Sequence, residues 1–500
     1  MPSRRSEHLA LGAVLLLACV VRVHGLGTWA FDQDELYTLR DAADLGSAHG
    51  GPGIIARPIF YVLEHLLLQI APPSAFVLRL PALVFGIAGV WLTGAIARRF
   101  FGAMGAVIAA LLVTLSPWHL YASQFARYWT LVYLLAGLAY LALPNAVDTD
   151  SPRRYLSALV ILLLGSFTHP TFLFPLTGAV LAINLVSADG KLEWRWPTRT
   201  AWMYLWGPLA LLAAGVGIAL AATQHLQAYN NWGSRGPAAM LRTAAGMIEW
   251  VNPAVAVAAI GAMWFLWTRP GARGDRRVVA IAALGVLTGV TLLLFAGLRT
   301  GVYADYAISM LPLLYLVIAG AVARLGETMA WGGSGFAVAA SSVLVAAVLP
   351  GLISNLSDGM RFDYRPAYRY VQERGGGRLV LGWPAAEQQH YAPDVPFQSL
   401  DGTTVNAYLL DRALIRAHGF WFVGSLHREE LVGADQSARD WVNAHCRTVL
   451  TTERPRFDYR EYRVELWWCG EDVSGMASAT PNRLGAGVPA LARRDSTHAD

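Results

Sequence analysis

Apolar runs of about 20 residues recur along most of this 500-residue chain, and they constrain its fold more than any other feature. Soluble domains carry roughly 25% charged residues, whereas only 15% of this chain is charged and 55% is hydrophobic. The runs are continuous rather than alternating, which argues against a membrane β-barrel. We therefore expect an α-helical polytopic membrane protein.

The apolar runs predict eleven membrane-spanning helices, at 9–27, 76–97, 103–118, 129–145, 155–169, 171–187, 201–222, 251–267, 278–297, 306–323 and 335–353. Arginine-rich short loops alternate with loops that hold only scattered arginines, and the arginine-rich set is expected in the cytoplasm. The N-terminus is then cytoplasmic, and an odd number of spans places the C-terminus outside. The net charge of +5 reflects this orientation rather than nucleic-acid binding, because the basic residues form no stripe.

The chain changes composition near residue 354, which divides a transmembrane module, 1–353, from a polar region, 354–475. We expect the polar region to be a small extracytoplasmic α/β domain. Its predicted helices and strands lie at 367–374, 378–383, 420–424, 435–445, 446–452 and 460–468. Residues 476–500 are rich in Ala, Gly, Ser and Arg, and we expect them to be disordered.

The polar region also holds two of the three cysteines, Cys446 and Cys469. They are expected to form a disulfide if the region lies outside the cytoplasm, and the sequence leaves both states open. The remaining cysteine, Cys19, falls inside the first apolar run. None of the three has the spacing of a metal site.

An acidic run, Phe31–Tyr37, follows the first span and begins a long outer loop, 28–75. Its three carboxylates, Asp32, Asp34 and Glu35, are costly beside hydrocarbon, so they must be held by partners or face a wet cavity. A sugar hydroxyl becomes a nucleophile when a positioned carboxylate takes its proton, which is one role for this run. Capping of a helix by Asp32 or Asp34 is the structural alternative.

Arg57 begins a short apolar segment, 57–70, that we expect to be a helix lying in the membrane interface. An arginine there can pair with a lipid phosphate or simply anchor the helix. Further polar and aromatic residues open on the same outer face, and they are Tyr37, Arg127, Tyr128, His169 and Arg299. Arg127 and Tyr128 can order a substrate or the acidic loop, or anchor the interface; Arg299 can neutralise a phosphate oxygen; a lone histidine such as His169 is usually structural.

In this order the segments resemble the GT-C superfamily of membrane glycosyltransferases, in particular bacterial protein-mannosyltransferases, aminoarabinose transferases and lipopolysaccharide galacturonosyltransferases. The resemblance is specific over residues 28–140 and mostly topological beyond 190. The residues that carry it are Asp34-Glu35-x-Tyr37, Arg57-Pro58, Leu78–Gly86, Arg98–Gly102, Ser116-Pro117, Ser123-Gln124, Arg127-Tyr128 and Thr168-His169.

This resemblance implies transfer of a sugar from a polyprenyl-phosphate-linked donor to an acceptor hydroxyl of an envelope lipid, glycan or protein. The reaction would take place at the outer face of a bacterial cytoplasmic membrane, with inversion at the anomeric carbon. Asp34 is the first candidate for the base and Glu35 the second, and Arg57 would hold the donor phosphate. The implied substrate-binding residues are Asp32, Tyr37, Arg57, Arg127, Tyr128, His169 and Arg299. No cofactor is predicted, although the carboxylates and His169 are compatible with a divalent metal.

Two positions depart from the family pattern. Many relatives have an acidic residue between Gln124 and Arg127, where this chain has Phe125 and Ala126. Many also have an Arg-Tyr pair at the start of a late span, where this chain has Asp305-Tyr306 and Arg299 stands nearby. These departures indicate an unusual donor or acceptor.

Two other classes of protein compete with the enzyme. A transporter or flippase of lipid-linked sugars also needs many helices and intramembrane charge. The sequence shows no two-fold hydropathy repeat and no buried charge in the middle of a span, which disfavours this class. A non-catalytic scaffold that binds envelope polymer is the second alternative.

Overall fold

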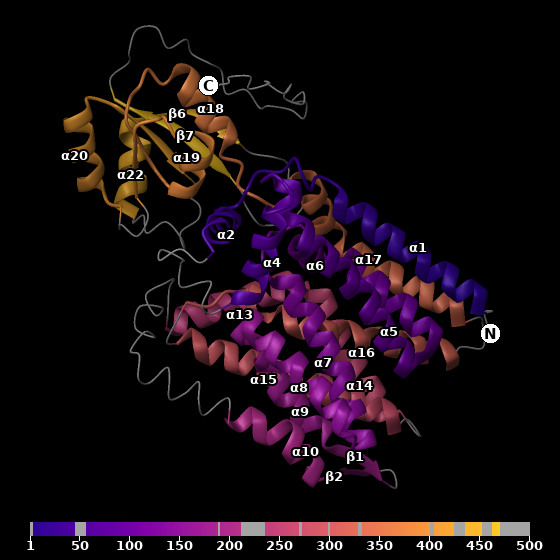
Figure 1. The fold of residues 1–500 in the computed structure, drawn as a ribbon. Helices are drawn as coiled ribbons and strands as arrows, with labels where there is room; N and C mark the ends of the chain where they lie inside the picture. Colours follow the sequence, from indigo (N-terminus) through magenta and orange to yellow (C-terminus); the bar gives the residue numbers. More distant parts are fainter. Residues whose placement is uncertain are drawn as a thin grey trace. The chain divides into compact units, whose positions relative to one another are not determined.

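A computed structural model describes residues 4–45, 57–188, 191–211, 236–269, 273–298, 301–328, 333–400, 405–424, 436–452 and 463–470. The chain divides into two compact units (Figure 1). Unit 1 comprises Met1–Arg361 with Arg456–Tyr459, and unit 2 comprises Phe362–Pro455 with Arg460–Asp500. The predicted tail, 476–500, lies outside the described residues.

Unit 1 is mostly helical, as the apolar runs predict. Its α-helices are α1 (Arg4–Val23), α2 (Gln33–Ala43), α4 (Pro58–Leu68), α5 (Ala75–Leu115), α6 (Pro117–Ser123), α7 (Trp129–Thr149), α8 (Pro152–Thr168), α9 (Leu173–Ile183), α10 (Arg199–Ala201), α13 (Pro237–Val251), α14 (Pro253–Thr268), α15 (Arg273–Gly297), α16 (Leu311–Thr328) and α17 (Gly333–Asp358). The described part of unit 1 also contains the 3₁₀ helices η1 (Pro170–Phe172) and η3 (Ala304–Met310), the π-helical segment η2 (Trp202–Trp206) and the hairpin of β1 (Leu185–Ala188) and β2 (Lys191–Trp194).

Six helical segments of the described chain are long and apolar enough to cross a membrane, and a seventh is added if the bent pair α13–α14 counts as one span. The protein is therefore a multi-pass membrane protein. The pair α13–α14 bends by 83° where Asn252 and Pro253 separate the helices. One expected span differs in extent, and another is only partly described. The span at 171–187 ends at Ile183 because β1 pairs with β2, and residues 212–222 of the span at 201–222 lie outside the described residues.

The 41-residue segment α5 is two helices that fold back on each other at Gly102. Gly102 has φ 72° and ψ −164°, a backbone conformation that glycine adopts without strain. A Cβ on Gly94 would lie 3.3 Å from the carbonyl oxygen of Ala106, so residues on either side of Gly102 are packed together. A straight helix rises about 1.5 Å per residue and would hold them far apart. The separate spans expected at 76–97 and 103–118 correspond to these two arms.

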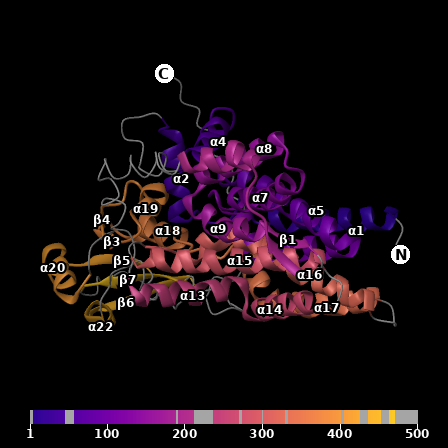
Figure 2. The same cartoon turned by 90° about the horizontal axis from the view of Figure 1, so that it is seen from below.

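The helices of unit 1 approach one another closely at glycines. α5 packs against α7 and α16 (Figure 1), and α15 runs along α9 (Figure 2). A Cβ on Gly178 of α9 would lie 2.1 Å from the carbonyl oxygen of Leu284 on α15, so only glycine permits this contact. Small residues allow the same close approach of helices in other membrane proteins.

Unit 2 is an α/β fold with a five-stranded sheet in the order β4-β3-β5-β7-β6. The strands are β3 (Val380–Gly382), β4 (Phe397–Ser399), β5 (Phe420–Gly424), β6 (Cys446–Thr452) and β7 (Val464–Cys469). β3 is parallel to β4 and β5, whereas β7 is antiparallel to both β5 and β6. The helices are α18 (Arg365–Arg374), α19 (Ala385–Tyr391), α20 (Ala407–Ala417) and α22 (Gln436–His445).

Both faces of this sheet are covered by buried apolar side chains. Phe422 and Trp467 pack with Trp441 of α22 on one face, and Trp421 and Trp468 pack with Tyr368 of α18 on the other. A disulfide joins Cys446 to Cys469, which are directly opposite each other on β6 and β7. The sequence alone did not decide whether this disulfide forms. The strand register explains it, because it places the two cysteines opposite each other.

Candidate active site

Helix α2 begins inside the acidic run and uses Asp32 as its cap. The Asp32 carboxylate accepts a hydrogen bond of 3.0 Å from the backbone N–H of Asp34, and the N–H of Asp32 donates to Glu35 over 3.1 Å. This reciprocal arrangement is a capping box, which satisfies N–H groups that the first helical turn leaves unpaired. The structural alternative for the acidic run therefore applies to Asp32.

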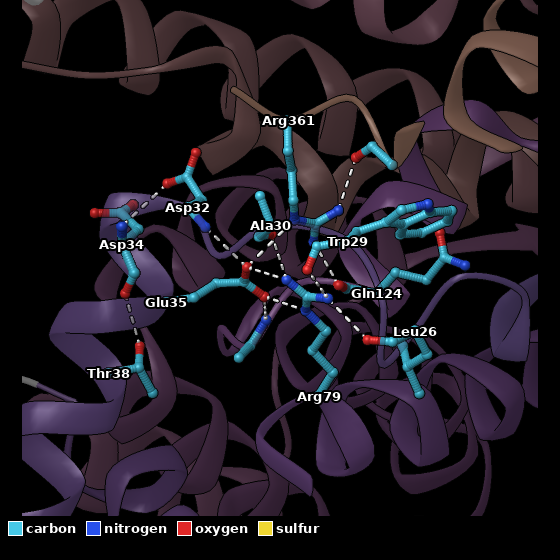
Figure 3. A network of polar contacts seen from close by, with 12 residues as sticks. Leu26, Trp29, Ala30, Asp32, Asp34, Glu35, Thr38, Arg79, Gln124 and Arg361 are labelled. Atoms are coloured by element: carbon cyan, nitrogen blue, oxygen red, sulfur yellow. Dashed lines mark hydrogen bonds and ion pairs between the residues drawn. The ribbon is translucent and has the colours of Figure 1, made fainter. Parts of the chain in front are cut away.

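Glu35 lies at the centre of a buried ion network (Figure 3) and is 0% exposed. Arg79 donates to both of its carboxylate oxygens over 2.8 and 2.7 Å, and Arg361 donates to one of them over 3.2 Å. The N–H of Ala126 adds a hydrogen bond of 2.9 Å. Burial alone would raise the pKa of Glu35, but the charges of Arg361 and Arg79 and these hydrogen bonds outweigh it and lower the pKa to about 2.

The two arginines also fix the backbone around the acidic run. Arg79 donates to the carbonyl oxygens of Leu26, Trp29 and Ala30, and Arg361 donates to that of Gln124 (Figure 3). Neither arginine was among the predicted site residues. Arg79 carried a usable signal, because a charge inside an expected span requires a partner. Arg361 carried none, since it lies 326 residues from Glu35 in sequence.

Asp34 has a very different environment from its neighbour Glu35. Its side chain is 51% exposed and forms an ion pair of 2.6 Å with Arg127, whose side chain is 9% exposed. Arg127 also donates to the hydroxyl of Tyr61 on α4 over 2.8 Å. One carboxylate of the run is thus enclosed, and the other is held by a buried cation while it stays open to solvent.

Tyr128 connects this pair to two further segments. Arg57 donates to the Tyr128 hydroxyl over 2.5 Å, and its guanidinium lies 4.9 Å from the ring centroid. His169 stacks on Tyr128 with ring centroids 5.0 Å apart and also packs against Tyr306. The outer loop, the Ser116–Tyr128 turn, the end of α8 and the start of η3 therefore meet at one place.

Two predicted site residues remain, Tyr37 and Arg299. Tyr37 accepts a hydrogen bond of 2.7 Å from Gln33 and lies under the guanidinium of Arg40, both on its own helix α2. Arg299 lies outside the described residues. Among the described residues, no three His, Cys, Asp or Glu side chains are gathered closely enough to hold a metal ion.

The structure gives the first departure from the family pattern a local explanation. The N–H of Ala126 binds Glu35, and the guanidinium of Arg361 lies 5.4 Å from the ring centroid of Phe125. Both residues are therefore part of the surroundings of the buried carboxylate. At the second departure, Tyr306 packs against Trp129 as well as His169.

The interface helix α4 forms one wall of this site. Phe60, Tyr61 and Glu64 are buried, whereas Leu66 is 57% exposed on the opposite side of the helix. A helix with one face on protein and an apolar face left open is suited to lie in a membrane interface.

Buried charges occur inside two expected spans, which the sequence analysis did not foresee. Arg22 of α1 and Arg79 of α5 are both 0% exposed. Arg22 donates to the carbonyl oxygens of Val113 and Thr114 at the end of α5 and contacts His119 over 2.8 Å. Both arginines lie near the ends of their helices rather than in the middle.

Comparisons with known proteins show which chains are similar to this one. The model of the family described as dolichyl-phosphate-mannose-protein mannosyltransferase matches residues 56–218. Two crystal structures of ArnT from Cupriavidus metallidurans are similar to the chain. The apo form has a TM-score of 0.52 at 11% identity, covering 92% of this chain and 97% of that chain. The form bound to undecaprenyl phosphate has a TM-score of 0.51 at 10% identity, covering 93% and 98%. No curated protein matches the chain by sequence.

The resemblance to the GT-C superfamily is thus confirmed at the level of the fold. The chain is a multi-pass membrane protein with a GT-C fold and a site where an open carboxylate, buried arginines and stacked aromatic rings meet. The matched residues include α4, the Ser116–Tyr128 turn and His169, whereas the acidic run with Asp34 and Glu35 lies outside the match.

Proposed function

We propose that the protein is an integral-membrane glycosyltransferase that transfers a sugar from a polyprenyl-phosphate-linked donor to an acceptor hydroxyl. The observation that carries this proposal is the pair of unlike carboxylates, Glu35 enclosed by two arginines and Asp34 half exposed beside Arg127. The similarity to an ArnT structure bound to undecaprenyl phosphate supports a lipid-phosphate donor.

In the proposed reaction Asp34 is the base. A carboxylate that is ionised and open to solvent can accept the proton of an acceptor hydroxyl as that oxygen attacks the anomeric carbon. Arg127 holds Asp34 in place over 2.6 Å. The bond from the anomeric carbon to the phosphate oxygen breaks as the new glycosidic bond forms, so a single displacement inverts the anomeric centre.

Arg57 is the proposed partner of the donor phosphate. Its guanidinium is fixed by the hydroxyl and the ring of Tyr128, so it is oriented before the donor binds. Negative charge grows on the phosphate as the bond to the sugar breaks, and a positioned cation stabilises that charge. Phosphate is a stable leaving group, and the reaction therefore needs no strong general acid. Tyr37, Tyr128 and His169 remain proposed contacts of the substrate.

Glu35 has a positioning role in this proposal. Its carboxylate oxygens accept bonds from two arginines and two backbone N–H groups, and it is enclosed from solvent. It fixes the first turn of α2, from which Asp34 projects. The acceptor is proposed to be a cell-envelope lipid, glycan or protein.

We further propose that the site opens on the outer face of a bacterial cytoplasmic membrane. The arginine bias of the loops supports this orientation. The disulfide between Cys446 and Cys469 supports it independently, because disulfides persist in oxidising compartments outside the cytoplasm. Unit 2 would then be extracytoplasmic.

Sugar transfer by the purified protein in liposomes tests the proposed function. Polyprenyl-phosphate sugars of different headgroups are offered with envelope lipids, with Asp34→Asn beside the wild type and with and without EDTA. We expect transfer by the wild type and a loss of at least about 100-fold in Asp34→Asn, the usual range for a positioned base. Loss in EDTA with recovery on adding one divalent metal would assign a metal to the site.

Three outcomes would contradict the proposal. Full activity of Asp34→Asn would remove Asp34 from the mechanism. Movement of intact lipid-linked sugar across the membrane without transfer would favour a flippase. Binding of envelope polymer without transfer or transport would favour a scaffold.

A further inference from the structure

Glu64 is a buried acid that the proposed reaction does not use. It lies on α4, it is 0% exposed, and neither of its carboxylate oxygens has a hydrogen-bond partner among the residues that the structure describes. Buried polar groups are nearly always hydrogen-bonded, since an unpaired one costs free energy that folding does not recover. An acid in this position requires an explanation beyond packing, because an apolar side chain would fill the same space at lower cost.

The position of Glu64 on α4 connects it to the site. Tyr61 and Glu64 are three residues apart and share one face of α4, and Arg57 is the residue just before the first turn of the helix. Arg57 binds the Tyr128 hydroxyl and Tyr61 binds Arg127, so α4 and its cap residue carry two contacts to the site. A change in how α4 sits against its neighbours would therefore move both contacts together.

The charged groups around α4 make an ionised Glu64 unfavourable. Burial raises the pKa of Glu64 to about 9, and the negative charge of Glu35 on α2 adds to the effect. The nearby cations of the site are already occupied. Arg79 of α5 is bound to Glu35 and to three carbonyl oxygens, and Arg127 is bound to Asp34 and Tyr61.

Other titratable groups on the elements packed against α4 have partners elsewhere. Asp41 on α2 pairs with Arg40, and His65 on α4 itself donates to the carbonyl oxygen of Ala42 over 2.8 Å. His169, which follows α8, is bonded to Thr171. None of these contacts supplies a counter-charge to Glu64.

We propose that Glu64 is a positioning residue of the site, a neutral carboxylic acid that seats α4 against α2 and thereby places Arg57 and Tyr61. Ionisation of Glu64 would put a second negative charge beside Glu35 in a medium of low dielectric constant. The favourable response is an outward shift of α4, which would carry Arg57 and Tyr61 away from Tyr128 and Arg127. This inference rests on the proposed function only for its activity readout.

The test compares wild type with Glu64→Gln, which keeps the shape of the neutral acid and cannot ionise. We expect similar transfer rates at pH 7. At pH 10, one unit above a pKa of about 9, roughly a tenth of the wild type keeps the neutral acid, so its rate should fall about tenfold relative to Glu64→Gln. Asp41→Asn is the matched control, because it removes another buried carboxyl of the loop. Its transfer rate at high pH should fall as that of the wild type does.

A second readout does not depend on catalysis. Hydrogen exchange of the α4 backbone amides, corrected for the intrinsic pH dependence of exchange, should increase in the wild type above pH 9 and stay constant in Glu64→Gln. If no donor supports transfer but this difference appears, the proposed function fails and the role of Glu64 stands. Superimposed pH profiles and equal exchange in the two proteins would overturn the inference, as would an inactive but folded Glu64→Gln at pH 7.

Discussion

At the scale of single residues, Asp34 and Glu35 show how two adjacent acids acquire different roles. They are neighbours in sequence, yet the Asp34 side chain is 51% exposed and that of Glu35 is 0% exposed. Adjacent positions on a helix point about 100° apart, so one faces the open site and the other faces the protein. The difference makes the two acids separable by experiment.

Glu35→Gln is expected to destabilise the protein far more than Asp34→Asn. Removing the Glu35 charge leaves Arg79 and Arg361 buried without a counter-charge, and breaking a buried pair in this way costs about 3–5 kcal/mol. The Asp34 pair is partly exposed and is worth about 1 kcal/mol or less. Thermal unfolding of both variants in the same detergent measures the difference. Equal melting temperatures of the two variants would contradict the inference that the buried ion network stabilises the outer loop.

The pH dependence of stability provides a second prediction about Glu35. Its pKa is lowered to about 2 in the folded protein, whereas an unfolded glutamate titrates near 4.5. A lowered pKa contributes stability that is complete above the unfolded value and is lost as the pH falls toward the folded value. The wild type should therefore lose stability between pH 4.5 and 2, and Glu35→Gln should lose less over that interval. If stability falls equally with pH in the two proteins, protonation of Glu35 does not contribute to acid unfolding over this interval.

The sequence grouped several site residues correctly in space but missed what holds them. The orientation of the spans predicted that Asp34, Arg57, Tyr128 and His169 open on one face, and the structure joins them through Arg127, Tyr128 and their contacts. The partners of Glu35 could not be foreseen, because pairing between Glu35 and Arg361 depends on how distant helices pack. Their functional roles stay predictions until the variants are assayed.

At the scale of elements, the hydropathy pattern located the helices but not their bends. The expected spans at 76–97 and 103–118 match the two arms of α5. An apolar run predicts that a segment is buried in lipid, but it does not predict whether the next segment continues straight or folds back. The turn at Gly102 has a weak signal in sequence, since 48 glycines occur in the chain and few of them sit at a reversal. Its positive φ appears only in the folded backbone.

Replacing Gly102 by alanine tests this reversal. A Cβ at Gly102 would meet nothing within 4 Å, so the cost is backbone strain alone, about 1–3 kcal/mol for this conformation. Gly261→Ala in α14 is the matched control, because its Cβ also meets nothing within 4 Å and its φ is not positive. The control should be neutral or slightly stabilising, as alanine is the better helix former. Equal thermal shifts in the two variants would argue against the strained turn.

At the scale of the whole molecule, the orientation in the membrane rests on an odd number of spans. The structure describes six long apolar segments, or seven with the bent pair, and one of them, α5, has two arms. The count of eleven therefore remains a prediction, because the apolar helical segment Pro170–Ile183 falls below the length of a standard span and part of 201–222 lies outside the described residues. The disulfide favours an external unit 2 independently of that count.

The disulfide makes the orientation measurable. In right-side-out vesicles, a membrane-impermeant reductant followed by a membrane-impermeant maleimide should label Cys446 and Cys469. In inside-out vesicles the same reagents should leave both residues unlabelled. Cys19 lies in α1 among apolar residues and should stay unlabelled in both preparations. A Cys446→Ser, Cys469→Ser double variant provides the background. Labelling confined to inside-out vesicles would place unit 2 in the cytoplasm and contradict the proposed orientation.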